Sequence, residues 1–267
     1  LLPIMIASTT TKIQLIYDQT ESTDWFDDMC NPTELTKSQY ITMIFKSGLY
    51  ITGCIKNCEC YIEKIFKTHI DRLINNISSG VEIIIAYDKS EDRSLEILLA
   101  LQAEYPLTII LASSSTNMRT YNIANARNKI LEYIQNDPKY EDLLMMDFDD
   151  VNLNGTLNLN LLEYVQTQNW SVLTFNRYPY YDIWALSIYP YTFSLLHYKN
   201  RNKLKHAMKS ELNQKLTQEI KKKGNDGLVN CISAFNGFAI YRTKMFSNIK
   251  YALILFLYFH LMELLVY

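Results

Sequence analysis

Short apolar runs alternate with amphipathic segments through the middle of the chain. A run that is apolar at nearly every position is typical of a strand buried on both faces of a parallel sheet. Such runs occupy residues 48–55, 81–87, 107–113, 142–146 and 171–177. Segments whose apolar positions recur every three or four residues predict helices; they occupy residues 60–78, 95–105, 120–136 and 157–168. The alternation predicts βαβ units, and hence an α/β fold with a mostly parallel sheet and helices on both faces.

The first predicted helix has a clear apolar face. Its apolar positions are Ile62, Ile65, Phe66, Ile70, Leu73, Ile74 and Ile77. Ser90 is expected to cap the next helix, with Glu91 and Asp92 in a first turn where the helix dipole favours negative charge. Residues 195–223 are charged and predict a solvated helix, and residues 228–242 predict one or two late strands.

The regular pattern has limits at both ends of the chain. Residues 1–47 show no clear period and are treated as an N-terminal extension of unclear structure. Residues 48–248 carry the predicted domain, and residues 249–267 form an apolar tail, possibly truncated or aberrant. Within the tail, residues 251–267 are shorter than the roughly 20 apolar residues that a membrane span needs. A buried terminal helix is therefore favoured over a membrane anchor, although membrane association through this segment remains an alternative.

Composition excludes several classes of function. The chain has 267 residues, of which 48% are hydrophobic, so it can bury a sizeable core. A net charge of −2 gives no support for nucleic acid binding. The five cysteines lack zinc-site spacing and a disulfide framework, which predicts reduced structural thiols. The N-terminal stretch lacks the basic lead of a signal peptide, so a cytoplasmic location is expected.

Candidate chemistry gathers where the predicted strands end. Asp147, Asp149 and Asp150 directly follow the apolar run 142–146, Asp88 follows the run 81–87, and the corner from Cys54 to Asn57 follows the first run. Ligands of open α/β sheets bind beyond the carboxyl ends of the strands, so these groups can share one site. Carboxylates two positions apart suit Mg²⁺ or Mn²⁺, while the residue between them, Phe148, packs away from the site. An acidic turn that caps the next segment is the alternative explanation.

An ordered set of segments extends this interpretation. The stretches "ITGCIKNCECYIEKIFKTHIDRL", "IIAYDKSEDRSLEIL", "RTYNIANARNKILEYI", "MMDFDDV", "YYDIWALS" and "SAFNGFAIYR" follow one another from about Tyr50 to Arg242. This set resembles the GT-A glycosyltransferases, whose D-x-D motif ends a central strand. It is similar to enzymes encoded by large DNA viruses and to the capsule-associated mannosyltransferase type. The resemblance implies a GT-A, Rossmann-like fold in the cytoplasm of a host or in a virus factory.

The resemblance also implies an activity and a donor site. Such an enzyme moves a sugar, of the hexosyl type, from a nucleotide diphosphate sugar to a hydroxyl of a glycan or protein acceptor, with Mn²⁺ or Mg²⁺. Asp149 would bind the metal, and Asp147 would contact the metal and the sugar or ribose of the donor. Arg127 would pair with these carboxylates or with phosphate. Residues expected at the base or ribose are Cys54, Asn57 and Asp88.

The acceptor side is expected in two other segments. Tyr181 and Trp184 flank Asp182, and aromatic faces stack on sugar rings while the carboxylate binds hydroxyls. Asn236 and Gly237 form a turn where glycine allows close approach of a ligand. Asp182 is the candidate catalytic base, since the acidic region that the family carries after its last strand is replaced here by the apolar tail.

Two other functions remain open from the sequence. Asp147, Asp149 and Val151 also match the D-x-D-x-V nucleophile motif of haloacid-dehalogenase-like phosphatases, in which Asp147 would form an aspartyl-phosphate. The other alternative is an inactive nucleotide-sugar-binding module of the same fold, because the acidic region after the last strand is missing.

Overall fold

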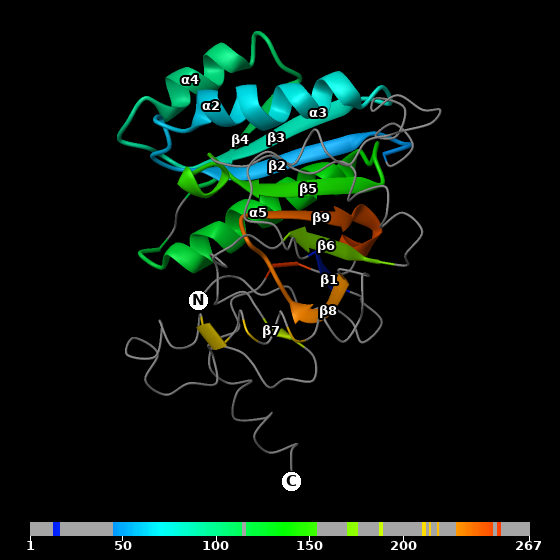
Figure 1. Cartoon of the computed structure of the whole chain (residues 1–267). Coiled ribbons are helices and arrows are strands. Elements are labelled where there is room, and N and C mark those ends of the chain that lie inside the picture. The colour runs from blue at the N-terminus through cyan, green and yellow to red at the C-terminus, as the bar shows by residue number, and fades with distance from the viewer. Residues whose placement is uncertain are drawn as a thin grey trace.

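A single sheet dominates the fold (Figure 1). The computed structural model describes residues 13–16, 45–113, 116–153, 170–175, 187–188, 210–211, 214, 218, 228–247 and 250–251. Over these residues the strand order is β4-β3-β2-β5-β9-β6-β1-β8-β7. The strands are β1 Ile13–Ile16, β2 Leu49–Ile55, β3 Val81–Tyr87, β4 Leu107–Leu111, β5 Asp142–Asp147, β6 Val172–Phe175, β7 Ser187–Ile188, β8 Leu228–Ser233 and β9 Phe238–Arg242.

The sheet is mixed, with most strands running in one direction. β4, β3, β2 and β5 pair in parallel, as β1 and β6 do. β9 lies antiparallel between β5 and β6, and β8 lies antiparallel between β1 and β7. β9 and β8 therefore run opposite to the other described strands, which places the carboxyl ends of β2, β3 and β5 at one edge of the sheet.

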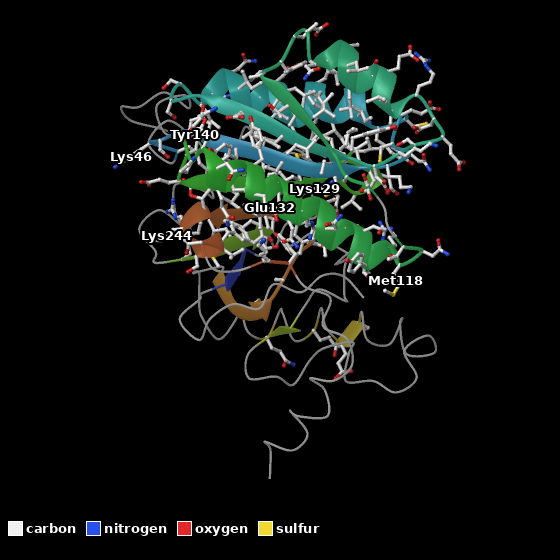
Figure 2. The ribbon with its side chains drawn as sticks, turned by 180° about the vertical axis from the view of Figure 1, so that it is seen from behind. Lys46, Met118, Lys129, Glu132, Tyr140 and Lys244 are labelled. Carbon is white, nitrogen blue, oxygen red and sulfur yellow. The ribbon has the colours of Figure 1, made fainter. Side chains whose placement is uncertain are left out.

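Helices cover both faces of the parallel half. One face carries α2 (Ile62–Ile65), the π-helix η1 (Phe66–Ile70), α3 (Asp71–Asn76) and α4 (Ser94–Leu101). The other face carries α5 (Arg119–Asn136), which Figure 2 shows in front of the sheet when the molecule is viewed from behind. Two short 3-10 helices, η2 (Asp150–Asn152) and η5 (Thr243–Phe246), follow β5 and β9.

Alternation along the strands divides the core into two layers. In β2, Leu49, Ile51 and Ile55 pack with α2, α3 and α4, whereas Tyr50 points to the layer of α5. Because both faces of β2, β3 and β5 are covered, their sequences are nearly continuous apolar runs. This is the physical reason why the sequence could locate these strands.

The expected fold class is confirmed, with differences in detail. The first predicted helix is one helical stretch that contains a π-turn, η1, and its apolar face is buried except for the partly exposed Ile74. The expected cap at Ser90 is wrong: α4 begins at Ser94, whose N–H donates to Asp92 Oδ1 over 3.0 Å. Ser90 Oγ instead accepts a hydrogen bond from the backbone of Asn57.

The ends of the chain are described only in part. Within residues 1–47, where the sequence indicated no element, β1 joins the sheet between β6 and β8. The helix expected at 157–168, most of the helix expected at 195–223 and the tail from residue 252 lie outside the described residues. In the described ranges, no helix is long and apolar enough to cross a membrane.

Candidate functional site

The acidic cluster lies at the carboxyl end of β5, in the middle of the sheet. Asp147 is the last residue of β5 and is paired in register with Cys54 near the end of β2. Phe148 is buried in the layer of α2 to α4, so it points away from the face that carries α5. Alternation along an extended backbone then directs Asp147 and Asp149 to the opposite side from Phe148. The two carboxylates and the packed aromatic between them agree with the arrangement expected from the sequence.

Arg127 comes from α5 and lies beside Asp147. Its Nη2 is 3.6 Å from Asp147 Oδ1, and its side chain is only 6% exposed. The guanidinium carbon lies 4.7 Å from the centre of the Phe235 ring and 5.4 Å from that of Tyr251. Burial by itself would lower the pKa of Arg127, but Tyr251, Asp147 and Cys54 raise it above its usual value. A permanent cation is therefore held by packing against two aromatic rings.

Cys54 is the third group at this corner. Burial raises the pKa of its thiol to about 11, although the charge of Arg127 opposes this shift. The thiol therefore stays protonated at neutral pH and is a poor nucleophile. Cys54, Cys58 and Cys60 form no disulfide with any described residue, in agreement with reduced thiols.

Asp149 has a role in the local backbone. It caps η2, and its Oδ1 accepts a hydrogen bond from the N–H of Val151 over 3.2 Å. Burial raises the pKa of Asp149, and nearby Asp150 raises it further, whereas the Val151 N–H and the charge of Arg119 lower it. Its carboxylate is thus held in one place in a partly desolvated position.

A single amide joins the acidic turn to the turn before β9. Asn152 Nδ2 donates to the backbone oxygens of Asp147, over 2.6 Å, and of Gly237, over 2.9 Å. The Asp147 N–H also donates to Gly237 O, over 2.8 Å. Gly237 has a φ of 84°, and a Cβ added there would lie 2.5 Å from Val151 Cγ1. His69 Nε2, on η1, lies 2.8 Å from Asn152 O and completes this network.

The nucleoside corner expected from the sequence lies beside β2 and β3. Asn57 has a φ of 53°, and its Oδ1 accepts the N–H of Glu91 over 2.8 Å. Asp88 follows β3, donates its N–H to Ile55 O and pairs with Lys56 Nζ at 2.8 Å. These contacts hold the loops after β2 and β3 together next to Cys54.

The predicted site residues fall into three groups. Cys54, Arg127 and Asp147 come together from β2, α5 and β5. The turn before β9 touches them through Gly237, while Asn236 is buried and donates to Phe175 O over 3.3 Å. The third group lies outside the described residues, so its acceptor and base roles stay predictions; it comprises Tyr181, Asp182 and Trp184.

Four residues at the site have no distinct signal in the sequence. Phe235 and Tyr251 pack on Arg127, and Asn152 and His69 fix the acidic turn. The Asn152 side chain could have been suspected, because asparagine often bonds backbone groups a few residues away. The contacts of the other three depend on tertiary packing.

The donor set at the end of β5 fits a hard divalent cation. No group of three or more His, Cys, Asp or Glu side chains that could hold a metal occurs among the described residues. Mg²⁺ commonly uses only one or two carboxylates and completes its shell with water and substrate phosphates. Asp149, with Asp147 beside it, offers such a set, whereas a structural zinc site would need more ligands.

Solved structures of glycosyltransferases resemble part of this chain. Mannosyltransferase PcManGT from Pyrobaculum calidifontis, in complex with GDP-Man and Mn²⁺, matches 47% of this chain and 34% of its own at 14% identity and TM-score 0.34. S. aureus TarS 1-349 matches 75% of this chain and 48% of its own at 15% identity and TM-score 0.40. Glucosyl-3-phosphoglycerate synthase from Mycobacterium tuberculosis, in complex with UDP, matches 80% and 64% at 10% identity and TM-score 0.41.

The family comparison covers most of the described domain. This chain spans about a third of the length of the Pyrobaculum protein and less than two thirds of the other two. No curated protein matches it. Its sequence matches "Glycosyl transferase family 2" over residues 54–249, which includes β2 from Cys54, α5, β5 and β9. The chain therefore belongs to glycosyl transferase family 2.

Proposed function

We propose that this protein is a metal-dependent glycosyltransferase that moves a sugar, of the hexosyl type, from a nucleotide diphosphate sugar to a hydroxyl of a glycan or protein. The observation that carries the proposal is the position of Asp147 and Asp149 at the carboxyl end of central strand β5, beside the buried cation of Arg127. Within a family 2 domain, we infer that Asp147-Phe148-Asp149 is the D-x-D motif, as in the similar enzymes of large DNA viruses.

The donor lies, in this proposal, along the edge from β3 to β5. Asn57 and Asp88 contact the nucleoside at the outer end, and Cys54 lies between them and Asp147. Asp149 holds Mn²⁺ or Mg²⁺ together with Asp147, which also contacts the sugar or ribose. When bound, the metal neutralises charge on the diphosphate and so assists departure of the leaving nucleotide. The buried Arg127 cation orients Asp147 and limits repulsion between the carboxylates.

The transfer itself exchanges one C–O bond for another. The acceptor hydroxyl oxygen attacks the anomeric carbon, the bond from that carbon to the diphosphate oxygen breaks, and its electron pair leaves with the nucleotide. The hydroxyl proton passes to a base, for which Asp182 is the proposed residue. Tyr181, Trp184 and the turn at Asn236 and Gly237 are the proposed acceptor contacts.

Paired aspartate variants test the metal role. Wild-type protein, Asp149→Asn and Asp150→Asn are compared for hydrolysis of nucleotide sugars and for thermal protection by UDP or GDP with Mn²⁺. Asp150→Asn is the matched control, because it removes the same charge from an adjacent exposed position. We expect Asp149→Asn to lose activity by more than about 100-fold, above the range for a group that only supports a ligand. Asp150→Asn is expected to stay close to wild type.

The same assay separates the alternatives. Nucleotide binding that survives both EDTA and Asp149→Asn contradicts metal dependence. Binding without turnover of any donor favours the inactive module. Release of phosphate from simple phosphomonoesters, lost in Asp147→Asn, would favour the phosphatase, a function that membership of glycosyl transferase family 2 argues against.

A further inference from the structure

The chain after β9 returns along α5 toward the site. Three residues of α5 hold it in turn: Gln135 Nε2 donates to Phe246 O over 2.7 Å, and Glu132 Oε1 pairs with Lys250 Nζ at 3.1 Å. Asn128 then holds Tyr251, one helical turn before Glu132. In Figure 2, Glu132 lies on the part of α5 that faces the viewer. The described residues 246–247 and 250–251, here called the return segment, thus follow the helix that carries Arg127.

Asn128 fixes the backbone of Tyr251 at two points. Its Nδ2 donates to Tyr251 O over 2.8 Å, and its Oδ1 accepts the Tyr251 N–H over 2.8 Å. An amide that bonds both polar groups of one residue leaves that residue little freedom to shift or rotate. Tyr251 is only 4% exposed, and its ring centre lies 5.4 Å from the guanidinium carbon of Arg127. The neighbouring residues Arg127 and Asn128 therefore meet the same tyrosine, one at its ring and one at its backbone.

The guanidinium of Arg127 depends on these rings more than a well-bonded arginine would. Its distance to Asp147 Oδ1, 3.6 Å, is longer than a normal hydrogen bond. Its buried Nε has no hydrogen-bond partner among the described residues. Aromatic contacts from Phe235 and Tyr251 are therefore main determinants of where the charge lies. Removal of one ring would leave space into which the guanidinium can move away from Asp147.

We propose that Tyr251 is a positioning residue for the metal-binding pair, which it serves by holding Arg127 against Asp147. The inference rests on the proposed function, because it takes Asp147 as part of the donor and metal site. Tyr251 lies two residues beyond the region that matches glycosyl transferase family 2, which ends at residue 249. The working site of this chain thus extends past the matched domain into the return segment.

Three variants test the proposal by calorimetric titration with UDP and GDP, with and without Mn²⁺. The readout is the factor by which Mn²⁺ strengthens nucleotide binding. Tyr251→Leu is expected to reduce this factor about tenfold, the size of a desolvated cation–π contact. Tyr251→Phe keeps the ring and is expected to stay close to wild type. Gln135→Ala is the matched control, because it loosens the same return segment at Phe246, away from Arg127.

The control variants decide between positioning and simple support of the fold. An unchanged Mn²⁺ factor in Tyr251→Leu overturns the proposal, and so does an equal loss in Gln135→Ala, since general loosening would then explain both. A reduced factor in Tyr251→Leu alone supports it.

A second measurement does not depend on the proposed function. If wild-type protein shows no Mn²⁺-dependent nucleotide binding, the proposed function fails, and a double-mutant cycle then tests the contact itself. Tyr251→Leu, Arg127→Met and the double variant are unfolded with urea. Effects on the unfolding constant that differ from multiplicative by about threefold or more support the coupling of the two residues. Effects that multiply simply overturn it.

Discussion

Phe148, the residue between the two aspartates, occupies the space above Gly53 of β2. A Cβ added to Gly53 would lie 2.4 Å from Phe148 Cε2 and 2.7 Å from Met146 O. Glycine in a strand often marks such a close approach. We expect Gly53→Ala to reduce the free energy of unfolding by about 1–3 kcal/mol, the usual range for overpacking. Urea unfolding measures this loss, and nucleotide titration with Mn²⁺ shows whether the displaced ring also disturbs Asp147 and Asp149.

A second-site change checks that explanation. Phe148→Leu in the Gly53→Ala background removes the ring atoms that the new methyl would strike, so part of the lost stability should return. Phe148→Leu in the wild-type background instead opens a cavity and lowers stability. Simple addition of the two single effects would contradict a direct clash between the residues.

At the residue scale, the sequence predicted the chemistry of the site better than its supports. Asp147, Asp149 and Phe148 follow from local reasoning, because a strand that ends in an alternating triplet fixes which side chains share a side. Tyr251 and His69 could not be predicted, since each meets the site from a distant part of the chain. Tyr251 in particular begins a segment that looks only apolar in the sequence.

At the scale of elements, η1, η2 and the turn before β9 are joined through Asn152. Its amide bonds two backbone oxygens, and its own carbonyl lies next to His69 on the π-turn, a feature frequent at functional sites. We expect Asn152→Leu to lower the free energy of unfolding by about 2–4 kcal/mol, because two backbone oxygens lose their partner at once. The variant should also bind nucleotide and Mn²⁺ more weakly. Urea unfolding and calorimetric titration measure the two effects.

Asn76→Ala is the control for this prediction. Asn76 Nδ2 donates to Arg72 O over 2.6 Å, a similar bond that stays within one helix. We expect this variant to bind nucleotide and Mn²⁺ as the wild type does. Asn152→Leu with unimpaired binding would show that the turn keeps its shape without the amide.

The elements themselves were predictable where burial on two faces determines the sequence. The runs at 48–55, 81–87 and 142–146 became β2, β3 and β5, since apolar side chains are needed on both sides of a covered strand. The strand order was not predictable, because β9 enters antiparallel between β5 and β6 from far along the chain. β1 has only four residues, too few for a period to be visible.

At the scale of the whole molecule, two buried groups make stability depend on pH in opposite senses. Burial raises the pKa of Asp142 to about 6, although Arg242 Nη1 lies 2.6 Å away and opposes the shift. Arg242 is partly exposed, and its guanidinium stacks on Trp170 at 3.9 Å, so its charge is partly solvated. Burial lowers the pKa of His69, with a contribution from Arg72, while the bond to Asn152 O opposes it. A carbonyl only accepts, so His69 Nε2 carries the hydrogen.

The signs follow from proton binding in the folded and unfolded states. Folded protein binds the Asp142 proton more tightly than the unfolded chain does, so this group favours the folded state as pH falls from about 6 toward 3.8. The shift of about two units limits its effect to about 3 kcal/mol. For His69 the folded state binds the proton more weakly, so stability is lost as pH falls below 6.5. The two contributions therefore oppose each other over the acidic range.

Two single variants separate these contributions in urea unfolding measured from pH 4 to 8. Asp142→Asn removes the group that favours folding in acid, so stability should fall more steeply than in wild type between pH 6 and 4. His69→Gln removes the group that penalises acid, so its loss below pH 6.5 should be shallower. Each variant is compared with wild type as a slope against pH, because a constant offset from lost contacts then cancels. Slopes that change in the same direction in both variants would contradict the assignment, since the two pKa shifts have opposite signs for stability.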